Sequence, residues 1–197
     1  MLTETGNSET AWPEIDIRPD LRVLIAGSTL VALVSAATLS APLALASTVL
    51  GALMIAGADV DARTYLLPDL VTLGALVCGV VAQFALDPFS PLQAAGLALA
   101  RGAATALVLM LVRWGYAWRR GREGIGLGDV KLAAAIGAWL PVEAIPLCFL
   151  LATAAAFVAV LLARLRGDSL DRATRIPFGA FLCPSLWLTF FLYAFVE

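Results

Sequence analysis

The sequence contains no histidine and few charged residues: Asp, Glu, Lys and Arg make up 14% of its 197 residues. The absence of histidine excludes Ser-His-Asp and Cys-His catalysis, HExxH zinc sites and histidine proton relays. The three cysteines lie in apolar runs without CxxC spacing, so we predict no disulfide framework, no metal site and no cofactor. A net charge of −2 gives no electrostatic footprint for nucleic acid. Any chemistry must therefore come from carboxylates, hydroxyls or the backbone.

Apolar sequence is abundant, at 61% hydrophobic residues against about 45–50% in ordinary soluble domains. It falls into seven runs, at residues 23–39, 43–58, 70–86, 92–114, 130–140, 142–165 and 178–196. A helix needs about 20 residues to span the hydrocarbon core, so the short fifth run requires an extension by the glycine-rich segment before it. The runs are apolar on every side, unlike the alternating strands of membrane barrels. We predict an all-α, polytopic membrane helix bundle of about seven transmembrane helices over residues 21–197, after a flexible acidic cytoplasmic tail over residues 1–20.

The basic residues are strongly segregated along these runs. Eleven of the 13 Lys and Arg residues lie ahead of the first run or in connections that a seven-span chain places on one side. The positive-inside rule makes that side cytoplasmic, so we expect a cytoplasmic N-terminus and an external C-terminus. Arg101 lies in the middle of the fourth run. It either pairs with a carboxylate of the bundle or marks a shift in the register of that run.

Four acidic residues lie at the ends of the predicted spans: Asp59, Asp61, Asp69 and Asp129. An ionisable group at a membrane-buried position is costly and therefore indicates function. Asp129 ends a Gly-x-Gly-Asp turn at residues 126–129, whose glycines let another chain approach closely. Such a turn alone is also typical of an Asp that starts a helix.

The seven-span arrangement places Asp61 and Asp129 on the same face of the membrane. Two carboxylates that approach each other cannot both ionise easily, so one is held protonated. This is the chemistry of an aspartic protease dyad, in which one carboxylate activates water and the other donates a proton to the scissile carbonyl. The titration belongs to the pair, so we assign neither role to either residue.

Three motifs, in this order, resemble those of the type IV prepilin peptidases, which are GxGD-type intramembrane aspartic proteases. They are Asp61 with Leu67-Pro68-Asp69, the segment Gly126-Leu127-Gly128-Asp129-Val130-Lys131-Leu132, and Ile176-Pro177-Phe178-Gly179. The resemblance covers roughly residues 43–195. It implies that Asp61 and Asp129 are the catalytic pair. It also implies that other matched residues support the loop or the substrate: Gly126, Gly128, Lys131, Pro68 and Asp69.

Asp59 is the rival of Asp61 for the first catalytic position. The step of eight residues from Asp61 to Asp69 matches the spacing of the family, whereas Asp59 would require ten. We expect Asp69 to cap the third span. Lys131 either extends its ammonium to the membrane surface or biases Asp129 toward ionisation.

The resemblance implies an aspartic endopeptidase of the cytoplasmic (inner) membrane that cleaves the basic leader of prepilin-like proteins just before their hydrophobic helix, at the cytoplasmic face. Longer family members carry an N-terminal domain with paired CxxC motifs, associated with N-methylation. Here an acidic tail stands in that region, so the chain resembles a short, peptidase-only form similar to those of tight-adherence (Flp) pilus systems. The expected partners are prepilin-like substrates and the lipid bilayer.

Two other classes of function are compatible with a strongly hydrophobic chain of several membrane spans. A small transporter or channel component would use membrane carboxylates for ion or proton coupling, and it predicts acids near the bilayer middle and repeats between the halves of the chain. The acids here lie at the ends of runs, and we find no convincing repeat. A purely structural membrane anchor leaves the GxGD and IPFG segments without an explanation.

Overall fold

The computed structural model describes residues 17–121, 124–166 and 176–196. These residues form seven α-helices and no strand: α1 (Leu21–Thr38), α2 (Ala41–Thr64), α3 (Asp69–Leu86), α4 (Pro91–Arg120), α5 (Leu127–Trp139), α6 (Ile145–Leu165) and α7 (Phe178–Val196). The prediction of an all-α bundle is confirmed. Six of the helices, all except α5, are long and apolar enough to cross a membrane. The chain is therefore a multi-pass membrane protein.

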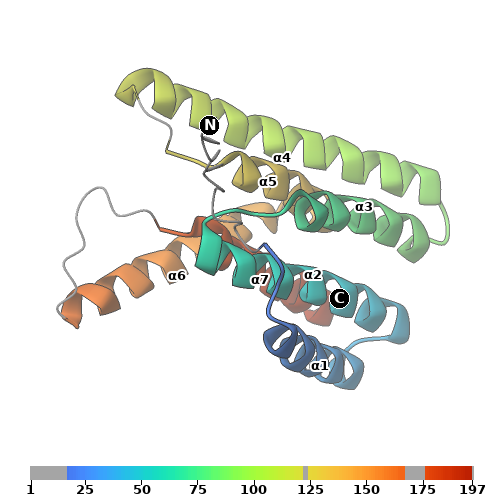
Figure 1. The fold of residues 1–197 in the computed structure, drawn as a ribbon. Helices are drawn as coiled ribbons and strands as arrows, with labels where there is room; N and C mark the ends of the chain where they lie inside the picture. The colour runs from blue at the N-terminus through green and yellow to red at the C-terminus, as the bar shows by residue number, and fades with distance from the viewer. Residues whose placement is uncertain (1–16, 122–123, 167–175, 197) are drawn as a thin grey trace, which may run out of the picture.

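The helices pack in the layers shown in Figure 1. Helix α4 runs along one side of the bundle against α5 and α3, while α2 and α7 form the next layer and α1 covers the outer side of α2. Helix α6 packs mainly on α7 and extends away from the body of the bundle. Within the predicted tail, residues 1–16 lie outside the described residues. Asp20 is the N-cap of α1, where its side chain accepts a hydrogen bond from the Arg22 N–H.

Helix α5 is shorter than the sequence pattern predicted. It has 13 residues and a length of about 20 Å, below the span of the hydrocarbon core. The glycine-rich segment extends the helix by only three residues, from Leu127 to Asp129, because Gly126 is extended and is the N-cap. At the other end Leu140 is extended, ahead of Pro141. Nine of the 13 residues are buried, so α5 is an internal helix enclosed by its neighbours.

Close contact between α4 and α5 depends on glycine. A Cβ on Gly102 would lie 2.7 Å from the Ala134 carbonyl oxygen, and one on Gly137 would overlap the backbone of Arg101. Small residues at membrane helix interfaces allow this approach of two backbones. The same contacts show that α4 and α5 run antiparallel, with residue 102 beside residue 134.

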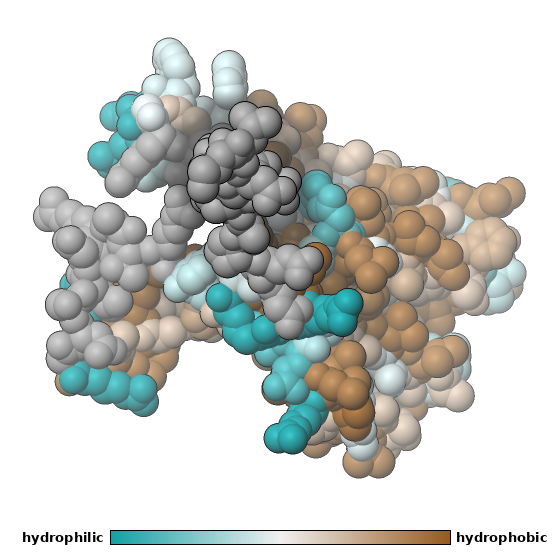
Figure 2. Space-filling model, in the orientation of Figure 1, coloured by the Kyte–Doolittle hydropathy of each residue, from teal (hydrophilic) through white to brown (hydrophobic). Residues whose placement is uncertain are grey.

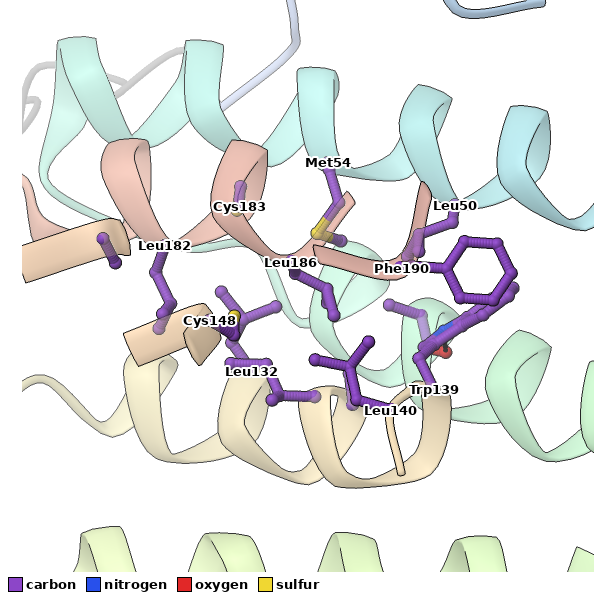
Figure 3. Close-up of a cluster of buried hydrophobic side chains, with 14 of the residues drawn as sticks. Leu50, Met54, Leu132, Trp139, Leu140, Cys148, Leu182, Cys183, Leu186 and Phe190 are labelled. Carbon is purple, nitrogen blue, oxygen red and sulfur yellow. Dashed lines mark hydrogen bonds between the residues drawn. The ribbon is translucent and has the colours of Figure 1, made fainter. Parts of the chain in front are cut away.

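The core lies where α2, α5 and α7 meet (Figure 3). Trp139 of α5 stands edge-on to Phe190 of α7, with ring centroids 5.2 Å apart. Its indole Nε1 donates a 2.7 Å hydrogen bond to the Ala75 carbonyl of α3. Leu50 and Met54 of α2 complete this part of the core. One tryptophan therefore ties α3 and α7 to the internal helix α5.

The outer surface is apolar, as expected for helices that face lipid. Figure 2 shows hydrophobic side chains over much of the bundle. Hydrophilic side chains gather toward the end where α4 and α6 finish (Figures 1 and 2). Large side chains such as Leu33, Val77 and Phe157 are more than half exposed. Exposure of this kind in six long apolar helices fits a bilayer as the surrounding solvent.

A cavity of about 490 Å³ lies at the end of the bundle where α5 stops, and its lining includes Arg101, Gln83 and Trp139. The Arg101 Nε donates to the Gly137 carbonyl at 3.2 Å, and the Gln83 Nε2 donates to the Trp139 carbonyl at 3.3 Å. These carbonyls belong to the last turn of α5, which has no following turn to bond them. The expected pairing of Arg101 with a carboxylate of the bundle is wrong, since its partner is a backbone carbonyl at the C-terminus of a neighbouring helix.

Candidate active site

Asp61 lies in the last turn of α2 and its side chain reaches the start of α7. The carboxylate accepts a 2.7 Å hydrogen bond from the Ala180 N–H and another from the Gly179 N–H. Free N–H groups in the first turn of a helix, together with the helix dipole, favour a negative charge at this place. The residue is buried, with 5% of its surface exposed. Asp61 is therefore an internal carboxylate held by the backbone of α7.

Asp129 is the third residue of α5 and is also buried, with 9% of its surface exposed. Its carboxylate accepts a hydrogen bond from the Gly126 N–H, so the Gly-x-Gly turn folds back onto the acid that follows it. A Cβ on Gly126 would lie 3.3 Å from one carboxylate oxygen of Asp129. The carboxylates of Asp129 and Asp61 are close enough for their charges to interact directly. The structure thus brings together the two aspartates singled out in the sequence.

Asp59 faces a different part of the molecule. Its carboxylate forms a 2.7 Å ion pair with Arg63 one turn later and accepts a 2.8 Å hydrogen bond from the Asp20 N–H. Arg63 also donates to the Arg18 carbonyl at 2.7 Å. These contacts fasten the segment before α1 to the end of α2. Asp59 is therefore engaged in a structural network away from the Asp61–Asp129 pair.

Lys131 and Asp69 form an ion pair between α5 and α3, with 2.5 Å between the ammonium nitrogen and a carboxylate oxygen. The N-cap position of α3 belongs to Pro68, and no side chain makes a capping hydrogen bond there. The expectation that Asp69 caps this helix is therefore wrong, because its carboxylate is turned toward Lys131. The pair joins the second turn of α5 to the first residue of α3, at the same end of the bundle as Asp129.

Three glycines surround the side chain of Leu67 beside the aspartates. They come from three helices: Gly57 of α2, Gly128 of α5 and Gly179 of α7. A Cβ on Gly179 would lie 2.6 Å from Leu67 Cδ1 and 2.9 Å from Asp61 Cγ. Cβ atoms on Gly128 and Gly57 would lie 2.9 Å and 3.4 Å from atoms of the same leucine. Any side chain at Gly128 or Gly179 would displace Leu67, and at Gly179 it would also displace the Asp61 carboxylate.

Sequence reasoning missed the part that Leu67 and Gly179 play in this geometry. Both residues belong to the matched motifs, so the sequence marked their positions. It did not indicate that their side chain and backbone would be in contact. Residues far apart along the chain meet here only because α2, α5 and α7 converge.

The arrangement offers two buried carboxyl groups at interacting range, each with a backbone N–H donor. Such a pair can share one proton, so one group can accept a proton from water while the other donates one. Among the described residues no group of three or more Cys, Asp or Glu side chains could hold a metal ion. The chemistry available to these groups is acid–base chemistry.

Comparison with known proteins identifies the family. The model of the type IV leader peptidase family matches residues 48–161. A prepilin leader peptidase/N-methyltransferase of Dickeya chrysanthemi is 40% identical over 141 residues, which cover 69% of this chain and 48% of that protein. Proteins of the same description from Burkholderia pseudomallei (strain 1026b) and Neisseria gonorrhoeae are 39% and 34% identical, covering 71% and 72% of this chain and 43% and 46% of their own lengths.

The chain spans about half the length of the curated relatives it matches. No solved structure gives a significant match. The matched family segment runs from the middle of α2 into α6 and contains both Asp61 and Asp129.

Proposed function

Because this chain belongs to the type IV leader peptidase family, we propose that it is a membrane aspartic endopeptidase that cleaves the N-terminal leader of prepilin-like precursors. The observation that carries the proposal is the meeting of two buried carboxylates, Asp61 and Asp129, from different helices. Like charges buried side by side are costly, and proteins retain them where they perform acid–base work.

Hydrolysis by this pair follows from the proton they share. The ionised carboxylate accepts a proton from a water molecule as the water oxygen attacks the scissile carbonyl carbon. The protonated carboxyl donates its proton to the carbonyl oxygen, which gives a neutral tetrahedral diol. In the second step the C–N bond breaks as the first carboxyl returns its proton to the leaving nitrogen, while a diol hydroxyl gives a proton to the other carboxylate. The pair ends with one proton, as it began.

The backbone around the site supports these roles. The N–H groups of Gly179 and Ala180 point at the Asp61 carboxylate and hold its orientation. Gly128 adds no side chain of its own at the start of α5, where Leu67 packs against it, so this stretch of backbone is accessible to close contact. The ion pair of Lys131 with Asp69 holds the start of α5 against α3. Gly126 and Pro68 shape the two turns that lead into these helices.

The proposed location is the cytoplasmic (inner) membrane, with the aspartates toward the cytoplasmic face. The segregation of basic residues supports this orientation. A precursor anchored by its apolar helix would then present its leader at the same face. Tight-adherence (Flp) pilins are the proposed substrate class within the prepilin-like proteins.

The test is co-expression of the full chain with a candidate prepilin, with leader removal followed by immunoblot. We expect Asp61→Asn and Asp129→Asn each to lower cleavage on the order of 10³-fold or more, because each removes one partner of a unit that shares a proton. Asp59→Asn is the matched control, since it changes the same residue type two positions away on α2 and should leave cleavage intact. Wild-type cleavage by either of the first two variants, at equal protein level, would contradict the assignment.

A further inference from the structure

The two aspartates are closed off in this structure. With 5% and 9% of their surfaces exposed, Asp61 and Asp129 cannot touch the backbone of a peptide that arrives from outside. Something next to them has to move before a substrate can bind. The neighbouring group that does not belong to the helix bundle is Leu67, from the segment of residues 65–68 between α2 and α3.

Leu67 fills a space that is bounded by backbone. One of its methyl groups, Cδ1, and the Asp61 carboxyl carbon both lie within 2.9 Å of the point that a Cβ on Gly179 would occupy. Its other methyl group, Cδ2, approaches Gly57 in the same way, and its Cβ approaches Gly128. The walls are therefore glycine backbone from three helices, with a carboxylate at one side. A space of this kind has the shape of one aliphatic side chain.

The segment that carries Leu67 is held by local contacts in the described part of the chain. The Tyr65 N–H donates to the Asp61 carbonyl at 2.8 Å, and the Leu66 N–H donates to the Thr64 hydroxyl at 3.3 Å. Tyr65 has a φ of 57°, a left-handed conformation that is uncommon for a residue other than glycine. Tyr65 and Leu66 are half exposed. Pro68 has no N–H to donate to the bundle. This short segment can lift without breaking a helix.

We propose that the space filled by Leu67 is a subsite for an apolar side chain of the substrate, and that residues 65–68 withdraw to vacate it. The inference rests on the proposed peptidase function and adds to it a specificity pocket and its internal occupant. The ligand is an extended peptide whose residue beside the scissile bond carries an apolar side chain. An anionic side chain would be excluded, because the glycine backbone offers it no partner and the Asp61 carboxylate at one side would repel it.

The accessibility of the buried Cys183 thiol on α7 can be used to detect whether Leu67 has withdrawn. Cys183 Sγ and Leu67 Cδ2 both approach Gly57, at 3.0 Å and 3.4 Å from the position of a Cβ on that residue. The Cys183 thiol therefore lies against α2, and its exposed surface is 0%. Removing the leucine side chain opens a path to this thiol.

The experiment measures alkylation by N-ethylmaleimide of the purified full chain in detergent, with each cysteine quantified by mass spectrometry. We expect Leu67→Ala to speed the labelling of Cys183 at least about threefold through easier local opening. Leu66→Ala is the matched control, because it truncates the exposed neighbour of the same residue type. Cys148, which is buried on α6, is the internal control and should keep its rate.

A second measurement tests whether Leu67 occupies a substrate subsite or only supports the packing of the helices. With a prepilin that the wild-type chain cleaves, Leu67→Ala should lower KM and keep kcat, because the substrate no longer competes with the leucine. Equal labelling of Cys183 in Leu67→Ala and Leu66→Ala would overturn the proposal, as would parallel acceleration at Cys148 or a fall in kcat with unchanged KM. Faster Cys183 labelling together with normal cleavage by Asp61→Asn and Asp129→Asn would overturn the proposed function and leave the plugging of this space by Leu67 supported.

Discussion

At one end of the bundle, Asp61 and Asp129 bring two charges of the same sign close together inside the protein. At the other end, Arg101 brings one positive charge into the bundle and places it on the carbonyl of Gly137. The arginine completes the last turn of α5, where an unpaired carbonyl would otherwise be left. The aspartates do the reverse, since each adds to the electrostatic cost of the other.

The difference shows how to separate structural from functional charges in a membrane bundle. A buried charge whose hydrogen bond satisfies a neighbouring helix end stabilises the fold. A buried charge beside another of the same sign costs stability, and function is the reason to keep it. Substitutions at the two ends should therefore give opposite results, with activity lost at the aspartate end and stability lost at the arginine end.

The largest effect is expected for Gly179→Ala at the aspartate end. The new methyl group would fall 2.9 Å from the Asp61 carboxyl carbon and 2.6 Å from Leu67 Cδ1, so both must shift. A displacement of about 1 Å at a reacting group lowers the rate on the order of 10²-fold. The measurement is the rate of leader removal at equal protein level. Gly115→Ala on α4 is the control, because nothing lies within 4 Å of its added methyl group; equal rates for the two variants would remove the special status of Gly179.

The intermediate effect is expected for Arg101→Leu at the arginine end. This change leaves the Gly137 carbonyl without its side-chain donor, which costs about 1–3 kcal/mol of stability. Thermal unfolding of the purified chain should show a midpoint lower by several degrees. Leader removal per folded molecule should stay at the wild-type level, and Arg119→Leu at the exposed end of α4 should change neither quantity. A folded Arg101→Leu protein with abolished cleavage would break the comparison.

The smallest effect is expected for the ion pair of Lys131 with Asp69. Its two side chains are 40% and 65% exposed, and exposed pairs contribute about 1 kcal/mol or less. Lys131→Met and Asp69→Asn should each slow cleavage a few-fold, and the double variant should be no worse than either single variant. This double-mutant cycle is read from the rate of leader removal. Fully additive losses of cleavage rate would show that the two residues act separately and not as an ion pair that joins α5 to α3.

The sequence was sufficient to predict the helices and the pairing of the aspartates. Apolar runs locate helices because lipid requires them, and the segregation of arginines places the ends of α2 and α5 on one face. The length of α5 could not be predicted in this way, since a buried helix can stop inside the bundle when side chains such as Gln83 satisfy its last carbonyls.

The contact partners of individual side chains could not be predicted from the sequence either. Lys131 meets Asp69, and Leu67 meets the glycines, because of the rotation and depth of α3, α5 and α7 relative to one another. A hydropathy pattern carries no information on those two quantities. The family motifs supplied the positions, and the packing supplied the contacts.

The length of helix α4 gives a scale for the depth of the aspartates relative to the membrane surface. Its 30 residues extend about 45 Å, roughly 15 Å more than the hydrocarbon core. Exposed aromatic rings near its C-terminal end, Trp114 and Trp118, belong at the headgroup layer. Because residue 102 lies beside residue 134, Asp129 is level with residues near 107, about 10 Å below Trp114 along the helix. With the function proposed above, the bond to be cut would be drawn about 10 Å below the level of Trp114, and the hydrolytic water would descend the same distance to reach it.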